Sequence, residues 1–308
     1  MKKSILALLF LLILSDHTRA CDACGCSLGA NYFGILPQFN KNFIGVRYSQ
    51  SHFNAHMHHE GSSLPDEYST DTYTRAELWG RFYLSPKIQL FAFVPYHYNT
   101  MEGNEQDAVV SGLGDITASA QWLVINTGED ALSKFKHTLR LGAGIKLPTG
   151  KFDEEDGGIL LTPNFQRGTG SVDFITNGLY TARLGKVGVN TEVGYKINTA
   201  NSDDYRFGNQ FNSAVSFFYW QNFKKAKVSL LPNAGVYFEQ ANKHTDGEIQ
   251  KPNTGGYATF FSYGLETYVG PFAIGFNIKT PIQQKLNTET GVDLQAGDRI
   301  NMHLTLNF

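Results

Sequence analysis

Beyond its first twenty residues, the sequence lacks any apolar run long enough to cross a bilayer as an α-helix. Charged residues are also scarce, at 18% of the chain, compared with roughly 25% in an average soluble domain. The net charge of −2 excludes the strongly basic character that a nucleic-acid partner requires. H-E-x-x-H and phosphate-loop motifs are absent, so we expect no enzymatic activity. The remaining classes are a soluble β-protein and a membrane-spanning β-barrel.

The first twenty residues have the pattern of a secretory signal peptide. Lys2 and Lys3 precede an apolar run at residues 5–14, which is too short to span a membrane as a helix. Thr18 and Ala20 stand three positions and one position before Cys21. This spacing predicts a signal peptide at residues 1–20 and export by the general secretory route, with retention of the segment as an anchor as the alternative.

Aromatic residues and glycine are abundant, with 23 Phe, 15 Tyr and 31 Gly. Membrane β-barrels use aromatic residues as girdles at the two membrane interfaces, and Gly where strands bend or pack closely. The last ten residues alternate strictly, because even positions from Ile300 to Phe308 are apolar and odd positions from Arg299 to Asn307 are polar. A strand with this period has one apolar and one wet face. Its length fits a tilted bilayer crossing, and its final Phe resembles the C-terminal signature of outer-membrane barrels.

The same alternation recurs along the chain and predicts an all-β fold, a single transmembrane antiparallel barrel of about twelve strands within residues 42–308. The expected strands cover residues 42–53, 71–84, 87–98, 115–126, 137–147, 170–184, 186–198, 209–221, 226–238, 257–269, 272–280 and 299–308. Tight turns alternate with long polar segments between them. Short periplasmic turns and long extracellular loops are typical of outer-membrane barrels, so we expect both barrel ends of the chain in the periplasm.

Three glycine-containing motifs lie in the middle of the chain. They are Gly112-Leu-Gly-Asp115, Gly144-Ile-Lys-Leu-Pro-Thr-Gly150, and Gly168-Thr-Gly-Ser171 followed by Asp173-Phe174. Through these motifs, residues 112–195 resemble the outer-membrane transporter family named for the meta-cleavage pathway of phenol degradation. The resemblance implies a barrel of this size, distantly similar to the long-chain fatty-acid channels, that takes up hydrophobic or aromatic compounds. The residues themselves indicate structural roles, because Pro148 and Gly150 end a strand and Asp115 suits a turn.

Charged residues occur on the polar face of several predicted strands, where a packed sandwich core would not tolerate them. A wet barrel interior accommodates such charges and lets them balance one another. We therefore assign to the lumen Arg140, Lys146, Glu192, Lys196, Lys279, Arg299 and His303. These charges favour a polar solute over a strongly apolar one.

All three cysteines, Cys21, Cys24 and Cys26, fall within six residues at the start of the exported chain. This spacing places two or three thiolates around a soft metal ion such as Cu(I). In the oxidising periplasm, the alternatives are a disulfide and lipid attachment at Cys21. Residues 21–41 are therefore expected to form a Cys-containing periplasmic segment, or a plug inside the barrel.

A second group of metal-ligand residues surrounds the first long loop. It consists of His52, His56, Met57, His58 and His59, and it holds four of the nine histidines of the chain. Imidazole and thioether ligands suit copper, and imidazole with carboxylate suits zinc or nickel. A His-rich surface loop without a metal is the alternative. No motif requires a cofactor, and copper or zinc are the ions that these residues would accept.

The sequence thus predicts an outer-membrane channel or transporter for small molecules in a Gram-negative bacterium. The expected partners are outer-membrane lipid, a small-molecule solute and the barrel-assembly machinery, with no nucleic acid. One alternative is a copper-handling barrel that uses the Cys and His groups. Another is a non-conducting barrel that binds or senses a ligand.

Overall fold

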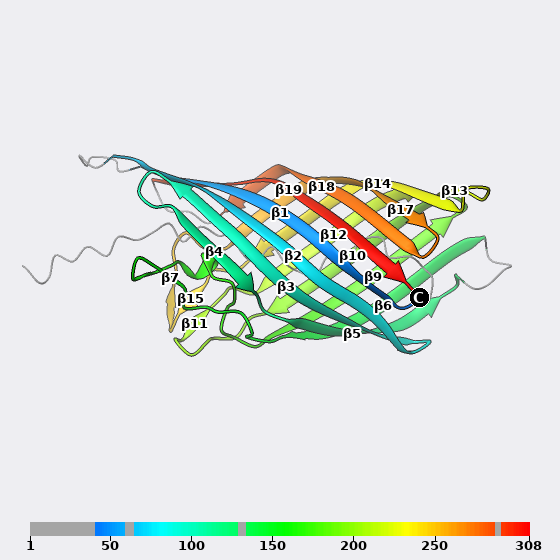
Figure 1. Cartoon of the computed structure of the whole chain (residues 1–308), viewed down its shortest axis with the longest axis horizontal. Helices are drawn as coiled ribbons and strands as arrows, with labels where there is room; N and C mark the ends of the chain where they lie inside the picture. Colours follow the sequence, from blue (N-terminus) through cyan, green and yellow to red (C-terminus); the bar gives the residue numbers. More distant parts are fainter. Residues whose placement is uncertain (1–40, 59–64, 129–133, 287–290) are drawn as a thin grey trace, which may run out of the picture.

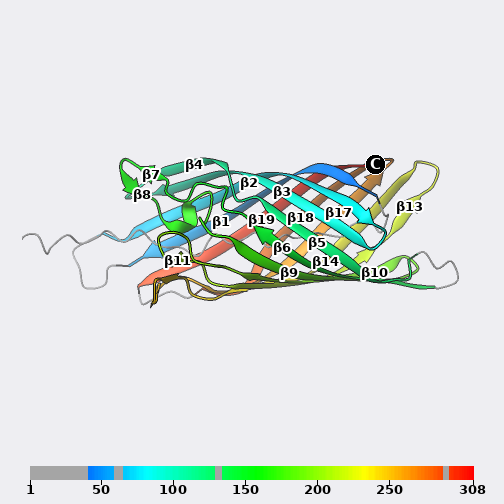
Figure 2. The ribbon, with the colours of Figure 1, turned by 90° about the horizontal axis from the view of Figure 1, so that it is seen from below.

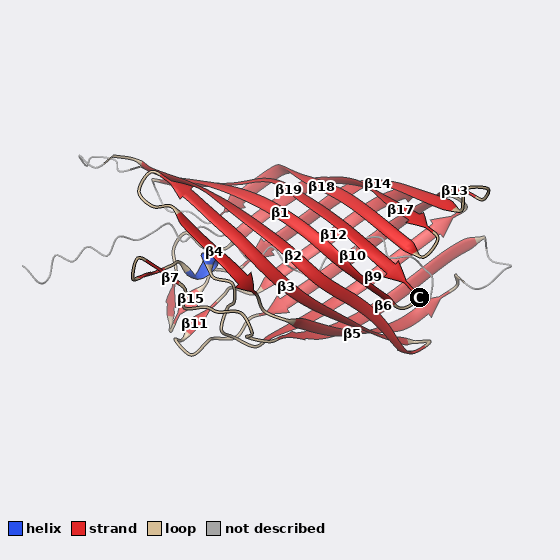
Figure 3. Ribbon diagram, in the orientation of Figure 1, coloured by secondary structure: helices blue, strands red, loops and turns tan. Residues whose placement is uncertain are grey.

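The structure, a computed structural model, describes residues 41–58, 65–128, 134–286 and 291–308. Twelve long strands form a closed antiparallel β-barrel (Figures 1 and 3). They are β1 (Phe43–Met57), β2 (Glu67–Ser85), β3 (Ile88–Gly103), β5 (Thr117–Asn126), β6 (Phe135–Lys146), β9 (Asp173–Leu184), β10 (Val187–Ile197), β12 (Gln210–Tyr219), β14 (Val228–Ala241), β17 (Gly256–Val269), β18 (Phe272–Leu286) and β19 (Val292–Asn307). Pairing of β1 with β19 closes the wall. The barrel predicted from the sequence is therefore confirmed.

The predicted signal peptide and Cys-containing segment, up to residue 40, lie outside the described residues. Within the described ranges, no helix has the length and apolar character needed to cross a membrane.

Several strands are longer at one end than the alternation predicts. β1 continues to Met57, β2 begins at Glu67, and β18 and β19 reach Leu286 and Val292. In these extensions many outward positions are polar, as where Asn54 stands opposite Thr70. The apolar signal that marks a strand in the sequence therefore stops while the backbone ladder continues. A further strand, β4 (Ala108–Leu113), pairs with β3 inside a segment that the sequence predicts to be a loop.

The two ends of the barrel differ in their connections (Figure 2). At the short-turn end, two residues join β2 to β3, β9 to β10 and β17 to β18. Asn42 and Phe308 also lie at this end, where the Phe308 N–H donates to the Asn42 carbonyl at 2.9 Å. β13 (Gln221–Phe223) precedes β14 there. The opposite, long-loop end carries β4, β7 (Glu155–Asp156), β8 (Ile159–Leu160), η1 (Pro163–Phe165), β11 (Tyr205–Arg206), β15 (Thr245–Asp246) and β16 (Ile249–Gln250).

The side chains of the wall separate into an apolar exterior and a polar interior. Outward positions carry large apolar residues such as Val46, Leu78 and Leu304, each about half exposed. The adjacent inward positions carry Arg47 and Glu77, which are buried. A contiguous apolar exterior is uncommon in a soluble protein, whereas it matches the lipid-facing band of outer-membrane barrels.

Apolar side chains also pack inside the barrel, in clusters on either side of the charged layer. Phe43 packs with Trp79 and Phe91 in one cluster, and Phe53 packs with Phe260 in another. On β1, Arg47 lies between Phe43 and Phe53 and faces the same side of the strand. The interior is therefore amphipathic along its length.

Candidate functional site: a chamber at the long-loop end

The connection between β6 and β9, residues 147–172, packs against the wall at the long-loop end. Phe165 of η1 is fully buried and Leu161 nearly so, both in a cluster with Ala108 and Val110 of β4. The Asn99 side-chain amide of β3 donates to the Phe165 carbonyl at 3.5 Å. Because the loop buries its own apolar side chains, it packs as a fixed surface and does not extend into the solvent.

A buried group of ions, which we name the Lys146 cluster, fixes both ends of this loop. Lys146 Nζ lies 2.6 Å from Asp115 Oδ2 and 3.0 Å from Asp173 Oδ2. It also donates to the Ser171 carbonyl at 3.0 Å and to the Thr169 hydroxyl. The side chains of Lys146, Asp115 and Asp173 are each less than a tenth exposed. Paired and hydrogen-bonded charges tolerate such burial, whereas isolated ones do not.

Asp115 links the same cluster to the backbone of the loop. Its carboxylate accepts the Gly150 N–H at 2.9 Å and the Thr169 N–H at 3.0 Å. The three glycine-containing motifs of the sequence therefore meet at one point in space. This contact joins the starts of β5 and β9 to the end of β6.

Close contact with residues of the loop explains two glycines of these motifs. A Cβ atom on Gly168 would lie 2.4 Å from the Gly150 carbonyl oxygen, so a side chain there would displace the backbone. Gly112 adopts φ 143°, and a Cβ on it would lie 1.8 Å from Arg167 Nη1. Arg167 Nε in turn donates to Glu154 Oε1 at 2.7 Å. The motif glycines thus allow the loop to lie directly against the strand ends.

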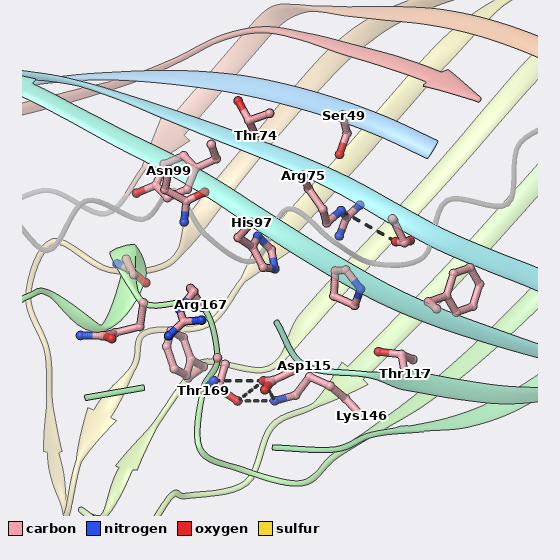
Figure 4. A pocket seen from close by; sticks show the side chains of 18 of the residues that line it. Ser49, Thr74, Arg75, His97, Asn99, Asp115, Thr117, Lys146, Arg167 and Thr169 are labelled. Carbon is pink, nitrogen blue, oxygen red and sulfur yellow. Dashed lines mark hydrogen bonds and ion pairs between the residues drawn. The ribbon is translucent and has the colours of Figure 1, made fainter. Parts of the chain in front are cut away.

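A cavity of about 160 Å³ lies between the loop and the inner faces of β1, β2 and β3. We call it the chamber. Figure 4 shows Asp115, Lys146 and Thr169 converging on one side of it, with Ser49 and Arg75 across from them. Its charged and aromatic lining residues are Tyr73, Arg75, Glu77, Phe93, His97, Asp115, Lys146, Arg167, Lys196 and Phe207.

Most charges of the chamber occur in pairs of opposite sign. Glu77 Oε1 accepts from Arg47 Nη2 at 2.9 Å and lies 3.8 Å from Arg75 Nε. Lys146 pairs with Asp115, and Arg167 pairs with Glu154. Paired charges give a polar surface with a weak net field, in contrast to a cluster of one sign.

The structure places the seven predicted lumen residues at inward positions of the wall. Five of them, Arg140, Lys146, Glu192, Lys279 and Arg299, are buried, and Lys196 and His303 are partly buried. Lys146 and Lys196 line the chamber, and the other five lie elsewhere in the interior. Arg299 pairs with Glu239 at 2.6 Å, and His303 Nε2 lies 3.1 Å from Glu266 Oε2. Lys279 Nζ lies 3.6 Å from the centre of the Tyr237 ring.

The structure divides the predicted His-rich group. His56 and His58 lie together at the long-loop rim beside Asp66. Met57 occupies the alternate face of β1, and the His52 ring hydrogen-bonds Thr72 Oγ1 at 2.9 Å. Cys21, Cys24, Cys26 and His59 lie outside the described residues.

A sequence profile described as "Putative MetA-pathway of phenol degradation" matches residues 67–285. The matched region contains the barrel wall from the start of β2 to the end of β18, except for the last residue of β18, and the whole Lys146 cluster. The chain belongs to this family. The resemblance seen in the glycine-containing motifs is therefore confirmed, and it extends well beyond residues 112–195.

The fold of this MetA-pathway family member is similar to that of solved outer-membrane barrels. The chain is similar to the COG4313 outer membrane channel from Pseudomonas putida F1, with a TM-score of 0.64 and 15% identity over 90% of this chain and 98% of that chain. Weaker likenesses are the beta domain of the Bordetella autotransporter Brka (TM-score 0.48, 10% identity, 87% and 99% covered) and the CymD monoaromatic hydrocarbon channel (0.40, 8%, 88% and 90%). The similarity at 0.64 shows a shared fold. No curated protein matches the chain.

Several residues of the chamber and of the Lys146 cluster are absent from the sites predicted from the sequence. Arg47, Arg75 and Glu77 line or support the chamber, and Asp173 completes the Lys146 cluster. The signal for Arg47 and Glu77 was present, because each alternates with outward apolar residues on its strand. Asp115 was interpreted as a turn residue, and the structure adds its ion pair with Lys146.

Proposed function

We propose that this member of the MetA-pathway family is a channel for small molecules in the bacterial outer membrane, with aromatic compounds as its preferred solutes. The observation that carries the proposal is the chamber, which lies inside a closed wall with an apolar exterior. A solute held there is surrounded by strands and a packed loop, and is shielded from lipid. A chamber near one end of the barrel would act as the selective section of the path.

Aromatic side chains in the chamber support the proposed class of solute. Tyr73, Phe93 and Phe207 line it next to the charged residues Arg75 and Glu77. An aromatic ring stacked on such a face gains about 0.5–1.5 kcal/mol beyond simple burial. Polar substituents on the ring would meet paired charges, which bind weakly enough to release the solute. Conduction requires this combination of entry and release.

Planar-bilayer recording of the purified protein tests the proposal. We expect stepwise conductance in KCl, and a reversible decrease of the current when sodium benzoate is added but not when sodium acetate is added. A Tyr73→Leu/Phe207→Leu variant should lose the benzoate effect, because it keeps apolar volume and removes two rings. Tyr96→Leu, on the lipid-facing surface, is the matched control and should keep it.

The two parts of the proposal fail in different ways. Folded protein that inserts without conductance would contradict the channel and leave a non-conducting binding barrel. Conductance that responds equally to benzoate and acetate would keep the channel and contradict the aromatic preference.

A further inference from the structure

A group of metal-ligand atoms lies at the long-loop rim, outside the chamber. His56 and His58 stand two residues apart at the end of β1, on its outward face. The neighbouring start of β2 brings Asp66 beside them. His58 Nδ1 lies 3.0 Å from Asp66 Oδ2, and His56 Nε2 lies 3.9 Å from the same oxygen. We propose that His56, His58 and Asp66 bind one divalent transition-metal ion of the kind that prefers imidazole ligands.

The separations between the donor atoms fit a tetrahedral ion. Two ligands that each lie about 2.0–2.1 Å from tetrahedral zinc are about 3.4 Å apart. The observed distances of 3.0 and 3.9 Å fall on either side of this value. All three donor atoms lie within 4.8 Å of one another. Side-chain rotations that move each donor atom by less than about 1 Å would therefore complete the site, and a water would occupy the fourth position.

The ligand set determines the class of metal. Two imidazoles and one carboxylate suit Zn²⁺, Ni²⁺ and Cu²⁺, with Cu²⁺ the most tightly held of the three. Ca²⁺ and Mg²⁺ require sets of oxygen ligands, which these residues do not supply. The three side chains are 42%, 45% and 49% exposed, so an ion reaches them directly from the solvent.

Neighbouring residues hold the ligands in place before any ion arrives. The Asn104 side-chain amide, from the turn after β3, donates to the Asp66 carbonyl at 2.9 Å. The side-chain oxygen of Asn104 accepts a hydrogen bond from the Tyr68 N–H at 2.9 Å, and the backbone N–H of Asn104 donates to the Tyr68 carbonyl at 3.2 Å. Asn104 is thus a positioning residue for Asp66.

The opposite side of the site is held by β19. The His58 N–H donates to the Gly291 carbonyl at 2.6 Å and continues the β1–β19 ladder past the end of β1. Asp293 of β19 stands directly across from His56. Side chains opposed in this way have Cβ atoms about 4.5–5.5 Å apart, so a second carboxylate adds negative charge beside the site.

Calorimetric titration of the full-length folded protein in detergent with ZnCl2 and with CuCl2 tests the proposal. The background carries Cys21→Ser, Cys24→Ser and Cys26→Ser, which removes the thiols as competing ligands. We expect one ion per chain, unaffected by excess CaCl2. His56→Ala, His58→Ala and Asp66→Asn should each weaken binding by at least about tenfold. His137→Ala, a histidine near the short-turn end, should leave the affinity unchanged.

Two further measurements separate this site from general attraction of metals to histidine. Asn104→Ala keeps every ligand and should still weaken binding about tenfold, because Asp66 loses its support. X-ray absorption of the zinc-loaded protein should show two imidazoles in the coordination shell. Unchanged affinity in the His58→Ala and Asp66→Asn variants would overturn the proposal. None of these outcomes depends on conductance, so the metal site and the channel stand or fall separately.

Discussion

Lys146 Nζ lies 2.6 Å from Asp115 Oδ2. The two residues are 31 positions apart in the sequence, and their contact joins the end of β6 to the segment that precedes β5. Asp173 completes the cluster from a third strand. The loop that forms one side of the chamber is therefore attached to the wall at both of its ends. A fixed loop keeps the chamber at a constant shape, which a selective path requires.

Removal of the cluster's cation should be costly. Lys146→Met leaves Asp115 and Asp173 buried without their counter-ion, and breaking a buried pair from one side costs about 3–5 kcal/mol. Urea unfolding followed by tryptophan fluorescence measures the loss. Lys151→Met is the control, because Lys151 is half exposed and its ammonium group lies 3.5 Å from Glu154, a longer contact than those of Lys146. Loss of this exposed pair should lower the free energy of unfolding by less than about 1 kcal/mol. Equal losses in the two variants would contradict a structural role for the cluster.

Contact between Gly150 and Gly168 gives a second prediction. Gly168→Ala should destabilise the protein by about 1–3 kcal/mol, because the added methyl group meets the Gly150 carbonyl. At Gly178 the nearest atom to an added Cβ is 3.6 Å away, so Gly178→Ala should be tolerated. The same unfolding assay compares the two. A Gly168→Ala protein as stable as Gly178→Ala would show that the loop does not lie against the strand ends.

Glu77 should influence ion selectivity, because it lines the chamber together with Arg75 and also pairs with Arg47. Glu77→Gln removes negative charge and leaves both guanidinium groups. The reversal potential in a KCl gradient should therefore shift toward chloride selectivity. Glu105→Gln, in an exposed turn of the long-loop end, should cause no shift. The same reversal potential in both variants would place the ion path away from the chamber.

Acid should destabilise the long-loop end of the barrel by protonating His244. Burial, with a smaller contribution from Lys196, lowers the pKa of His244 from 6.5 to about 4. The ring hydrogen-bonds the Tyr205 hydroxyl at 2.9 Å. Because the unfolded chain takes up the proton at higher pH than the folded one, stability falls as the pH drops from about 6.5 toward 4. At pH 5 the loss is about 2 kcal/mol.

Urea unfolding at pH 8 and pH 5 checks this linkage. His244→Gln removes the titrating ring, so the variant should lose less stability than the wild type between the two pH values. An identical loss in both proteins would assign the acid sensitivity to other groups.

Local alternation predicts much of the barrel, because the period of two applies within each strand. On the last strand, the apolar positions Leu304 and Phe308 are about half exposed on the outer surface, whereas the polar position Arg299 is buried in the interior. Alternation also separates Met57 from His56 and His58 on opposite faces of β1, although grouping by composition placed them together. The strand extensions were missed because polar outward residues carry no apolar signal outside the membrane band.

Contacts between distant residues could not be predicted in the same way. Alternation alone indicates which face of its strand Lys146 occupies, but its partners Asp115 and Asp173 depend on the register of the neighbouring strands and on the path of a long loop. Asp66 became a neighbour of His58 only through the pairing of β1 with β2. Non-local pairing of this kind is fixed by closure of the whole barrel.

Thiol modification inside the chamber tests the central claim most directly. Ser49→Cys places a single reactive thiol on the chamber wall in the background without Cys21, Cys24 and Cys26. Thr70→Cys places one on the exposed outer face of β2. A bulky, charged methanethiosulfonate reagent should reduce the single-channel current of the Ser49→Cys protein by more than half and leave the Thr70→Cys current unchanged. Full modification of Ser49→Cys without any change in current would contradict a solute path through the chamber.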